Sequence, residues 1–318
     1  MKNTDEYIDQ KTLFDGYYKE KILPKLQIIE EQRKKYFYLF MSSLIFTIIW
    51  GVIYVTGVAS DFFGKLEECA INVGLIFCII VLLLCIPMIG YHRHAKESLL
   101  PILANFFGDF EYSYKTVLDH EILYASKIMP KYDEIEFDDG FDGVYENTEI
   151  SITEYVTYKE KIVHNNNVSQ YKLKKDKRGL VFCASMNKQF KGQTVVVKDK
   201  GIFNTFNKVK GLEVVHLEAP LFEKEYEVYS DSQIEARYIL TPVMLRYMEE
   251  LKHYFSKIEF SFFDDMVFIN ILTKKNMFEC NSFFISIINK KRIYKSFDEL
   301  YLLFSIIHTM HLNEERML

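Results

Sequence analysis

Two long apolar segments near the N-terminus dominate the hydrophobic pattern of the chain. The first covers about residues 36–58 and the second about residues 70–90, and no charged residue interrupts either one. A membrane-spanning helix needs about 20 consecutive apolar residues, because each residue advances about 1.5 Å across a hydrocarbon core of about 30 Å. The pattern therefore predicts a two-helix transmembrane hairpin over residues 36–91, with spans at about 36–58 and 70–90.

Basic residues flank the two segments unevenly. Residues 33–35 are Arg-Lys-Lys and precede the first segment, while Arg93 and Lys96 follow the second. The connecting stretch has Lys65 against three acidic residues. Because basic residues stay on the cytoplasmic side of a membrane, both termini are predicted to be cytoplasmic.

Residues 1–35 form a separate, mostly polar segment. Apolar side chains recur there at roughly helical spacing, with Pro24 as an interruption; they are Leu13, Tyr17, Ile22, Leu26 and Ile29. This spacing predicts an N-terminal cytoplasmic helical segment. Two interpretations remain open, since the apolar side chains could pack on the protein's own domain or face a partner or surface.

The remaining residues, 92–318, mix helical and strand patterns. A helix is expected over residues 94–128, alternating strands follow, and Ser230 with Gln233 fits the capping box of a later helix. A second helix should begin at Thr241-Pro242, and a hairpin should turn at Asp264-Asp265. This order predicts an α+β cytoplasmic domain behind the transmembrane hairpin.

Charge divides this domain into an acidic and a basic stretch. Residues 133–154 contain acidic residues and no Lys or Arg, and the overall net charge of −5 argues against a nucleic-acid binder. Basic residues gather soon after; they are Lys172, Lys174, Lys175, Lys177 and Arg178. A basic loop at this position could bind anionic lipid headgroups, or it could be a solvated loop paired with the acidic stretch.

A second group of polar residues is a candidate binding site. Glu218, Asp231, Glu235 and Arg237 lie within one short stretch. Glu235 and Arg237 are two apart on a predicted helix and would point away from each other, so Arg237 is expected to meet another carboxylate, such as Glu218. The group is either a structural ion-pair network or a ligand site.

No known metal, cofactor or catalytic motif stands out. Asp138, Asp139 and Asp142 alternate with glycines, but their spacing does not match an EF-hand loop, so a turn is the preferred interpretation. The five cysteines contain no Cys-x-x-Cys pair. The sequence therefore predicts no metal, no cofactor and no catalytic residues.

One stretch resembles a known family. Residues 217–242, together with the segments 190–194 and 138–143, resemble the bacterial family catalogued as domain of unknown function 3137, and the likeness extends over about residues 97–273. Ser232 departs from the acidic residue expected at that position. The resemblance implies a bacterial protein with a membrane hairpin ahead of its domain, and it implies no activity and no site residues.

These observations lead to a functional hypothesis with one alternative. The leading hypothesis is a non-enzymatic protein of the inner membrane, integral to the lipid bilayer, whose cytoplasmic domain binds a protein partner or the membrane surface. The alternative is a membrane-bound enzyme that uses the group from Glu218 to Arg237.

Overall fold

The computed structural model describes residues 4–55, 90–165, 168–186, 189–199, 209–255, 257–279 and 282–310. The chain divides into two compact units. The sheet unit contains Met1–Tyr7, Leu103–Phe278 and Ser296–Leu318, and the helical unit contains Ile8–Ile102 and Glu279–Lys295. Each unit is described by itself below.

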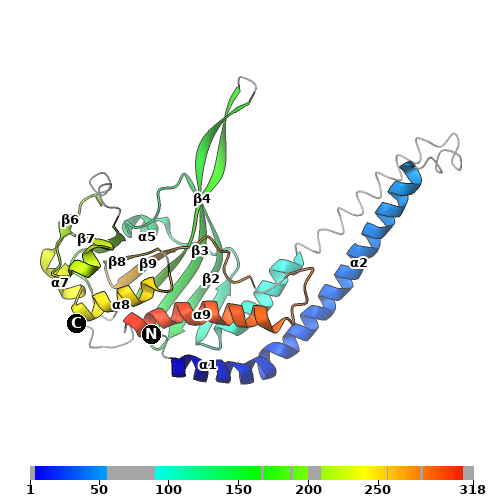
Figure 1. The fold of residues 1–318 in the computed structure, drawn as a ribbon, viewed down its shortest axis with the longest axis horizontal. Coiled ribbons are helices and arrows are strands. Elements are labelled where there is room, and N and C mark those ends of the chain that lie inside the picture. The colour runs from blue at the N-terminus through cyan, green and yellow to red at the C-terminus, as the bar shows by residue number, and fades with distance from the viewer. Residues whose placement is uncertain are drawn as a thin grey trace. The chain divides into compact units, whose positions relative to one another are not determined.

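A nine-stranded antiparallel sheet organises the sheet unit, in the order β1-β2-β3-β4-β9-β8-β5-β7-β6 (Figure 1). Its strands are β1 (Asp109–Ser113), β2 (Glu134–Tyr145), β3 (Thr148–Asn165), β4 (Val168–Ser185), β5 (Thr194–Lys198), β6 (Glu213–Val215), β7 (Tyr226–Ser230), β8 (Ile258–Phe263) and β9 (Met266–Leu272). The β8–β9 hairpin confirms the predicted turn, where Asp264 adopts a positive φ of 53°. Every residue of β8 is buried, so this hairpin lies at the centre of the sheet.

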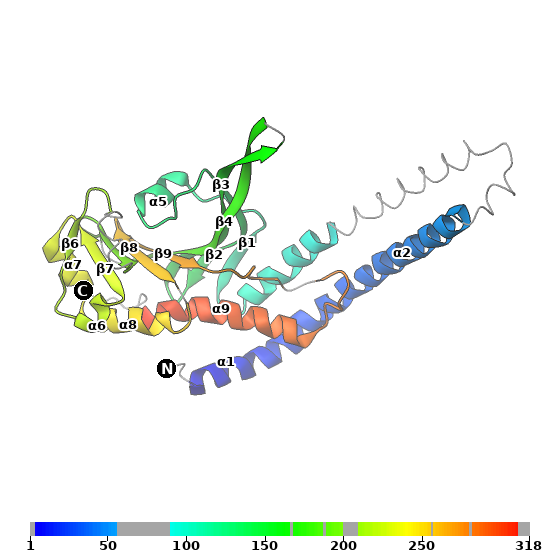
Figure 2. The ribbon, with the colours of Figure 1, turned by 45° about the horizontal axis from the view of Figure 1, so that its top comes forward.

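Helices cover both faces of the sheet. They are α5 (His120–Ala125), α6 (Pro220–Glu223), α7 (Gln233–Ile239), α8 (Pro242–Lys252) and α9 (Lys290–Met310). Figure 2 shows α5 on one face, and α8 with the part of α9 after Lys295 on the other. Thr241 caps α8 and Pro242 opens it, as predicted. The cap of α7 is Ser232 rather than the predicted Ser230, because Ser230 is buried at the end of β7.

The face beneath α5 holds an apolar core cluster. Leu123 and Ile128 pack there against side chains of the sheet, among them Tyr155, Val181 and Phe268. Two polar bonds lie within this core, because the Tyr155 hydroxyl donates to Asn270 Oδ1 at 2.7 Å and Asn270 Nδ2 donates to the Ile128 carbonyl at 3.1 Å. The buried amide of Asn270 therefore uses both its oxygen and its nitrogen.

The predicted helix over residues 94–128 is shorter than expected. A helix ends at residue 104, and β1 and α5 follow. Gly108 lies at this change of structure, where an added Cβ would lie 2.6 Å from the Val144 carbonyl oxygen. The chain approaches β2 closely at this point and pairs with it, which a continuing helix could not do.

The helical unit contains most of α1 (Thr4–Tyr17), the π-helix η1 (Tyr18–Ile22), α2 (Leu23–Val55) and part of a helix over residues 90–104. The wide π turn ends two residues before Pro24, which has no N–H to donate to a carbonyl four residues earlier. Ile22, Leu26 and Ile29 are buried, whereas Leu13 is exposed. The described part of this segment is helical, and three of the five apolar side chains named from the sequence are buried.

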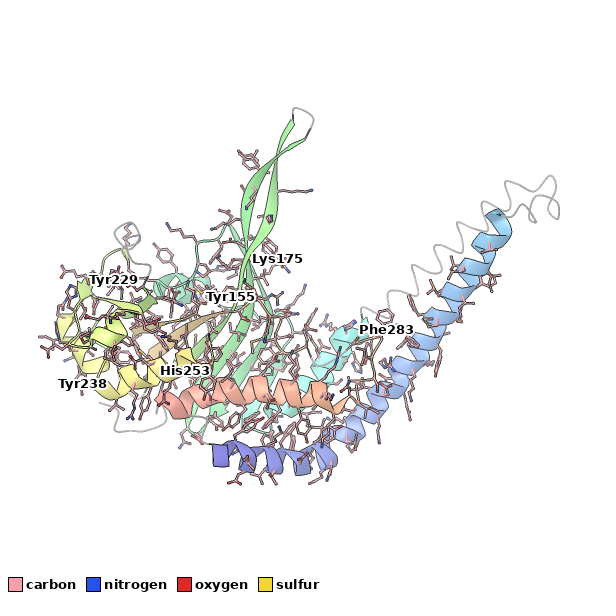
Figure 3. All side chains as sticks on the ribbon, viewed as in Figure 1. Tyr155, Lys175, Tyr229, Tyr238, His253 and Phe283 are labelled. Atoms are coloured by element: carbon pink, nitrogen blue, oxygen red, sulfur yellow. The ribbon has the colours of Figure 1, made fainter. Side chains whose placement is uncertain are left out.

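A glutamate–arginine pair is buried inside the helical unit. Arg33 Nε and Nη2 donate to the two carboxylate oxygens of Glu30 at 2.8 and 2.7 Å. The Ile287 backbone N–H also donates to Glu30, and Arg33 Nη1 donates to the Phe283 carbonyl at 2.7 Å. Figure 3 labels Phe283, which the aromatic rings of Phe37 and Phe40 contact.

The predicted two-helix transmembrane hairpin is contradicted. In the ranges that the structure describes, no helix combines the length and apolar character needed to cross a bilayer. The first predicted span continues the 33-residue helix α2, whose first half is charged and holds the Glu30–Arg33 pair. The second predicted span, residues 70–90, lies outside the described residues except for its last one. The predicted two-span location in the inner membrane, with cytoplasmic termini, is contradicted by the same finding.

Candidate functional site

The predicted basic loop is a β-strand. Lys172, Lys174, Lys175, Lys177 and Arg178 all belong to β4, which pairs with β3 along nearly its whole length. In Figure 1 the β3–β4 hairpin extends beyond the rest of the sheet. Four lysines share one face of this extension, whereas Ile162, Tyr171 and Leu173 lie exposed on the other, so its apolar side chains do not form a buried face.

One edge of this extension has no strand beside it. β9 pairs with β4 only from Gly179 to Ser185, and the Thr273 N–H makes the last bond, to the Arg178 carbonyl. Among the described strands, β3 alone pairs with β4 between Val168 and Arg178. The outer edge of that stretch therefore presents backbone donors and acceptors to its surroundings.

Like charges face each other across the hairpin. Lys174 is directly opposite Lys159, and Lys172 is directly opposite Lys161. Such pairs destabilise a sheet because their side chains lie on the same face, close together. Asp176 lies at a shift in the β3–β4 register, and its carboxylate pairs with Lys159 at 3.1 Å. Among the described residues, this ion pair only partly relieves the repulsion between the lysines.

A groove of about 1110 Å³ lies beside the base of the hairpin. Val156, Phe255, Ile271 and Met277 are buried apolar residues of its lining. Six basic residues line it as well: Lys175, Lys177, Arg178, Lys257, Lys274 and Lys275. Asp176 and Glu299 are the acidic residues of the lining, so the groove has an apolar floor and an excess of positive charge. Figure 3 shows Lys175 at the base of the hairpin.

The basic residues of the groove differ in their partners. Arg178 pairs with Glu154 at 2.6 Å, and Lys257 pairs with Glu259 at 3.2 Å. No carboxylate among the described residues lies within ion-pair distance of the other four, which are Lys175, Lys177, Lys274 and Lys275. These four lysines are exposed and carry the uncompensated charge of the groove.

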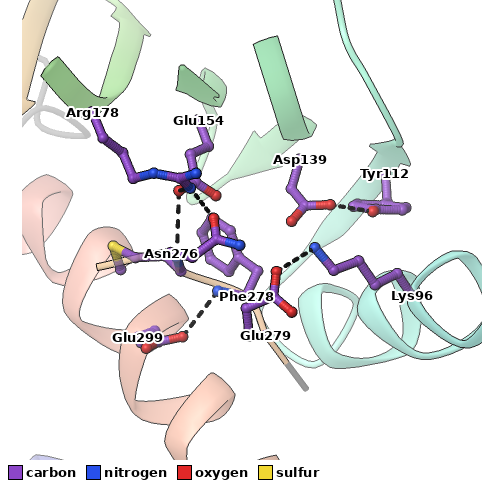
Figure 4. Close-up of polar contacts among 10 residues, drawn as sticks. Lys96, Tyr112, Asp139, Glu154, Arg178, Asn276, Phe278, Glu279 and Glu299 are labelled. Atoms are coloured by element: carbon purple, nitrogen blue, oxygen red, sulfur yellow. Dashed lines mark hydrogen bonds and ion pairs between the residues drawn. The ribbon is translucent and has the colours of Figure 1, made fainter. Parts of the chain in front are cut away.

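The partner of Arg178 is a fully buried carboxylate. Glu154 accepts from Arg178 Nη1 through Oε1, and the Met277 N–H donates to the same oxygen at 3.4 Å. Asn276 accepts a further bond from Arg178, so the guanidinium is held between two side chains (Figure 4). Burial raises the pKa of Glu154 to about 7, and the nearby Asp139 adds to the increase, while Arg178 opposes it.

A bulge in β2 brings two aspartates to Glu154. β2 and β3 pair at Phe137 and again at Gly140, with a register shift between them. Asp138 and Asp139 lie in that shift, opposite Glu154, and one carboxylate oxygen from each of the three residues lies within 4.8 Å of the others. Asp139 is buried and accepts a hydrogen bond from the Tyr112 hydroxyl. The segment predicted as an Asp/Gly turn is therefore strand, because β1 and β3 pair with it on either side.

The second predicted group does not converge on one point. Asp231 Oδ1 accepts from the Gln193 N–H at 2.9 Å, and Glu235 Oε1 accepts from the Lys191 N–H at 3.5 Å. Arg237 donates to Gln233 and to the His216 carbonyl instead of to the expected Glu218. Glu218 is exposed. In the described structure, Asp231, Glu235 and Arg237 thus make local hydrogen bonds at turns and helix ends.

Sequence reasoning missed the residues that complete the site. Lys274, Lys275 and Asn276 follow β9, and only the fold brings them beside β4. Glu154 could have been recognised, because it lies on the same face of β3 as Ile152 and Val156, two residues before and after it. An acidic residue at an apolar position of an alternating strand indicates a buried charge that needs a partner.

Comparisons with known proteins find a match to one family of unknown function and indicate no activity. Residues 177–312 match the model of the family described as "Protein of unknown function (DUF3137)". No curated protein matches the chain. Among solved structures, the crystal structure of the mycobacterial trehalose monomycolate transport factor A, TtfA, is similar with 7% identity and a TM-score of 0.36. The match covers 66% of this chain and 93% of that chain, and likeness at this level carries no argument about function.

The family match confirms the resemblance seen in the sequence. The characteristic stretch, residues 217–242, lies inside the matched range, as do Arg178 and the groove residues after β9. Residues 177–312 are therefore similar to the DUF3137 family of proteins of unknown function.

Proposed function

We propose that this chain is a non-enzymatic binding protein whose basic groove binds an extended acidic segment of a partner protein. The observation that carries the proposal is the set of four exposed lysines without a carboxylate partner among the described residues, Lys175, Lys177, Lys274 and Lys275, around one apolar-floored groove. A binding site with concave shape, apolar floor and a charged rim suits a ligand that carries both apolar and acidic side chains.

The open edge of β4 gives a reason to favour an extended polypeptide. A peptide strand could pair with the free backbone groups between Val168 and Arg178, next to the groove. Its acidic side chains would then lie near Lys172 and Lys174, where lysines of β3 now face lysines of β4. A membrane surface would use the lysines, but it would use neither the strand edge nor the concave floor.

The test measures peptide binding by the purified full-length chain. A fluorescent peptide of alternating Glu and Val residues serves as the probe, and fluorescence anisotropy reports its binding. Affinity should fall as salt rises, because exposed charges are screened beyond about 8 Å at physiological ionic strength. A peptide with N-methylated backbone amides keeps the charges but cannot pair as a strand, so it should bind at least about tenfold more weakly.

A matched pair of variants identifies the surface. Replacing Lys175, Lys177, Lys274 and Lys275 with Gln should weaken peptide binding about tenfold or more, at about 0.5 kcal/mol for each exposed contact. The control replaces four exposed lysines elsewhere in the sheet unit, Lys131, Lys191, Lys210 and Lys224. It changes the net charge equally and should leave affinity nearly unchanged.

Two outcomes would overturn the proposal. Equal weakening in both quadruple variants would mean that net charge, and not the groove, attracts the peptide. Binding to phosphatidylglycerol vesicles that depends on the groove lysines, without any peptide binding, would favour a membrane surface as the ligand.

A further inference from the structure

A second feature of the sheet unit lies next to the groove, at the bulge in β2. Asp138, Asp139 and Glu154 bring three carboxylates together at the β2 bulge, and an oxygen of each lies within 4.8 Å of the others. Oxygens that bind one calcium or magnesium ion at about 2.0–2.6 Å are separated by at most about twice that distance. The spacing of the three oxygens therefore fits coordination of a single ion.

The buried glutamate supplies an independent observation. The Glu154 side chain is 0% exposed, and among the described residues its Oε2 atom has no hydrogen-bond partner, although Oε1 is bonded to Arg178. Leaving a buried charged oxygen without a partner costs free energy, so such atoms are rare in folded proteins. Figure 4 shows the Glu154 carboxylate between Arg178 on one side and Asp139 on the other. The unpartnered oxygen is therefore part of one of the three carboxylates that the bulge assembles.

The chemistry of the three side chains fits a hard cation. Carboxylate oxygens are ligands that calcium and magnesium prefer. Arg178 is bonded to Glu154, and the Tyr112 hydroxyl and the Met277 N–H donate hydrogen bonds to the cluster.

We propose that Asp138, Asp139 and Glu154 form a binding site for a hard divalent cation of the calcium or magnesium type. Asp139 and Glu154 are buried and supply oxygens from within the sheet, while Asp138 is half-buried. Asp138 therefore lies on the side from which an ion and its remaining water ligands enter. The bulge explains the arrangement, because two residues of β2 oppose a single residue of β3 there.

The test measures metal binding by the full-length chain after removal of metals with a chelator. Titration calorimetry with calcium, magnesium and manganese chlorides should detect one site for at least one ion, and that ion should raise the thermal midpoint. Asp138→Asn should weaken binding of that ion at least about tenfold, as losses around metal ligands do. The control is Asp142→Asn, because Asp142 is exposed on the same strand and lies outside the cluster.

Glu154→Gln gives a second, independent measurement. It keeps the shape of the side chain and the bond to Arg178 but removes the charge, so metal binding should be lost while the groove lysines stay intact. Absence of binding by all three ions would overturn the proposal and leave a buried water as the partner of Oε2. Binding that both Asp138→Asn and Glu154→Gln leave unchanged would overturn it as well.

Discussion

A buried glutamate–arginine pair lies in each unit of this protein, and the two pairs have opposite surroundings. Glu30 in the helical unit uses both carboxylate oxygens, bonded to Arg33 and to the Ile287 N–H. Glu154 in the sheet unit uses only Oε1, and its Oε2 has no hydrogen-bond partner in the part of the chain that the structure describes. The same two residue types thus form a complete structural pair in one unit and an incomplete one in the other.

The pKa values follow from that difference. Burial pushes the pKa of Glu30 upward, but the hydrogen bonds from Arg33 and Ile287 outweigh it and hold the pKa below its usual value. For Glu154 burial prevails, with the charge of Asp139 adding to it, and the pKa rises to about 7. A satisfied ion pair stabilises its charges, whereas an unsatisfied one keeps its carboxylate close to protonation at neutral pH. For this reason the incomplete pair, and not the complete one, is the candidate site.

The largest expected effect comes from breaking the complete pair. Arg33→Ala leaves the buried carboxylate of Glu30 without its partner, and the free energy of unfolding should fall by about 3–5 kcal/mol. Urea denaturation of the full-length chain, followed by hydrogen exchange of the amides of α2, measures the loss. A change below about 1 kcal/mol would mean that Glu30 is accessible to water in solution.

The next largest effect is a pH dependence that distinguishes the two glutamates. The native pKa of Glu154 exceeds its unfolded value, so this residue contributes stability below about pH 4.5 that is lost as pH rises through 7. Without metal, the free energy of unfolding of the wild type should fall by about 3 kcal/mol relative to that of Glu154→Gln between about pH 5 and about pH 8.

Glu30 should show the opposite sign. Its lowered pKa means that its contribution is present above the unfolded pKa and is lost as pH falls below it. The difference between the wild type and Glu30→Gln should therefore shrink in acid. Urea unfolding midpoints of both variants and the wild type are measured across the pH range. If the two variants differed from the wild type in the same way at every pH, the two glutamates would not have opposite pKa shifts.

Removing the arginine of the incomplete pair should cost less. After Arg178→Ala, Glu154 can bind a proton because its pKa is already near neutral, so at about pH 6 the loss should be about 1–2 kcal/mol, that of a few hydrogen bonds. The measurement is the same urea denaturation, at that pH. A loss as large as that of Arg33→Ala would show that Glu154 stays ionised.

The smallest effect is expected at an exposed pair. Arg93 and Glu97 contact each other one helical turn apart at 2.7 Å, and both side chains are exposed. Arg93→Gln should change the free energy of unfolding by less than about 1 kcal/mol, because water screens the charges. Thermal unfolding midpoints of Arg93→Gln and Arg33→Ala are measured side by side. Similar shifts in the two variants would show that burial does not determine how much an ion pair contributes to stability.

Local signals predicted part of this fold well. The β8–β9 hairpin could be predicted because apolar runs flank the Asp264-Asp265 turn, and α8 because Thr241 and Pro242 mark its first residues. The β3–β4 extension was interpreted as a loop, because basic residues dominate it and its apolar side chains, Ile162, Tyr171 and Leu173, are few and exposed. The apolar runs near the N-terminus predicted a membrane hairpin, and this prediction was wrong. Hydropathy alone does not show that the first predicted span continues a helix whose first half contains the buried Glu30–Arg33 pair.

The candidate sites depended on tertiary structure to a greater degree. Asp138 and Asp139 suggested a turn because Asp and Gly favour turns, and only pairing on both sides makes the segment a strand. The basic residues of β4 were found as a charge cluster, but nothing local indicated that Lys274 and Lys275 would lie beside them. A charge pattern predicted which residues are unusual, while the fold determined which of them meet.

The bulge in β2 also bears on which changes of chain length this protein can tolerate. Residues before the bulge pair with β3 from Glu134 to Phe137, and residues after it pair from Gly140 onward. Deleting a single residue at 138 or 139 would leave one β2 residue opposite Glu154, so the pairing on either side would keep its register. Ile135 and Phe137, which pack beneath α5, would stay on the same face. A deletion of one codon at this position should therefore remove the bulge but harm the sheet less than a deletion between Glu134 and Phe137, which would turn side chains there to the opposite face.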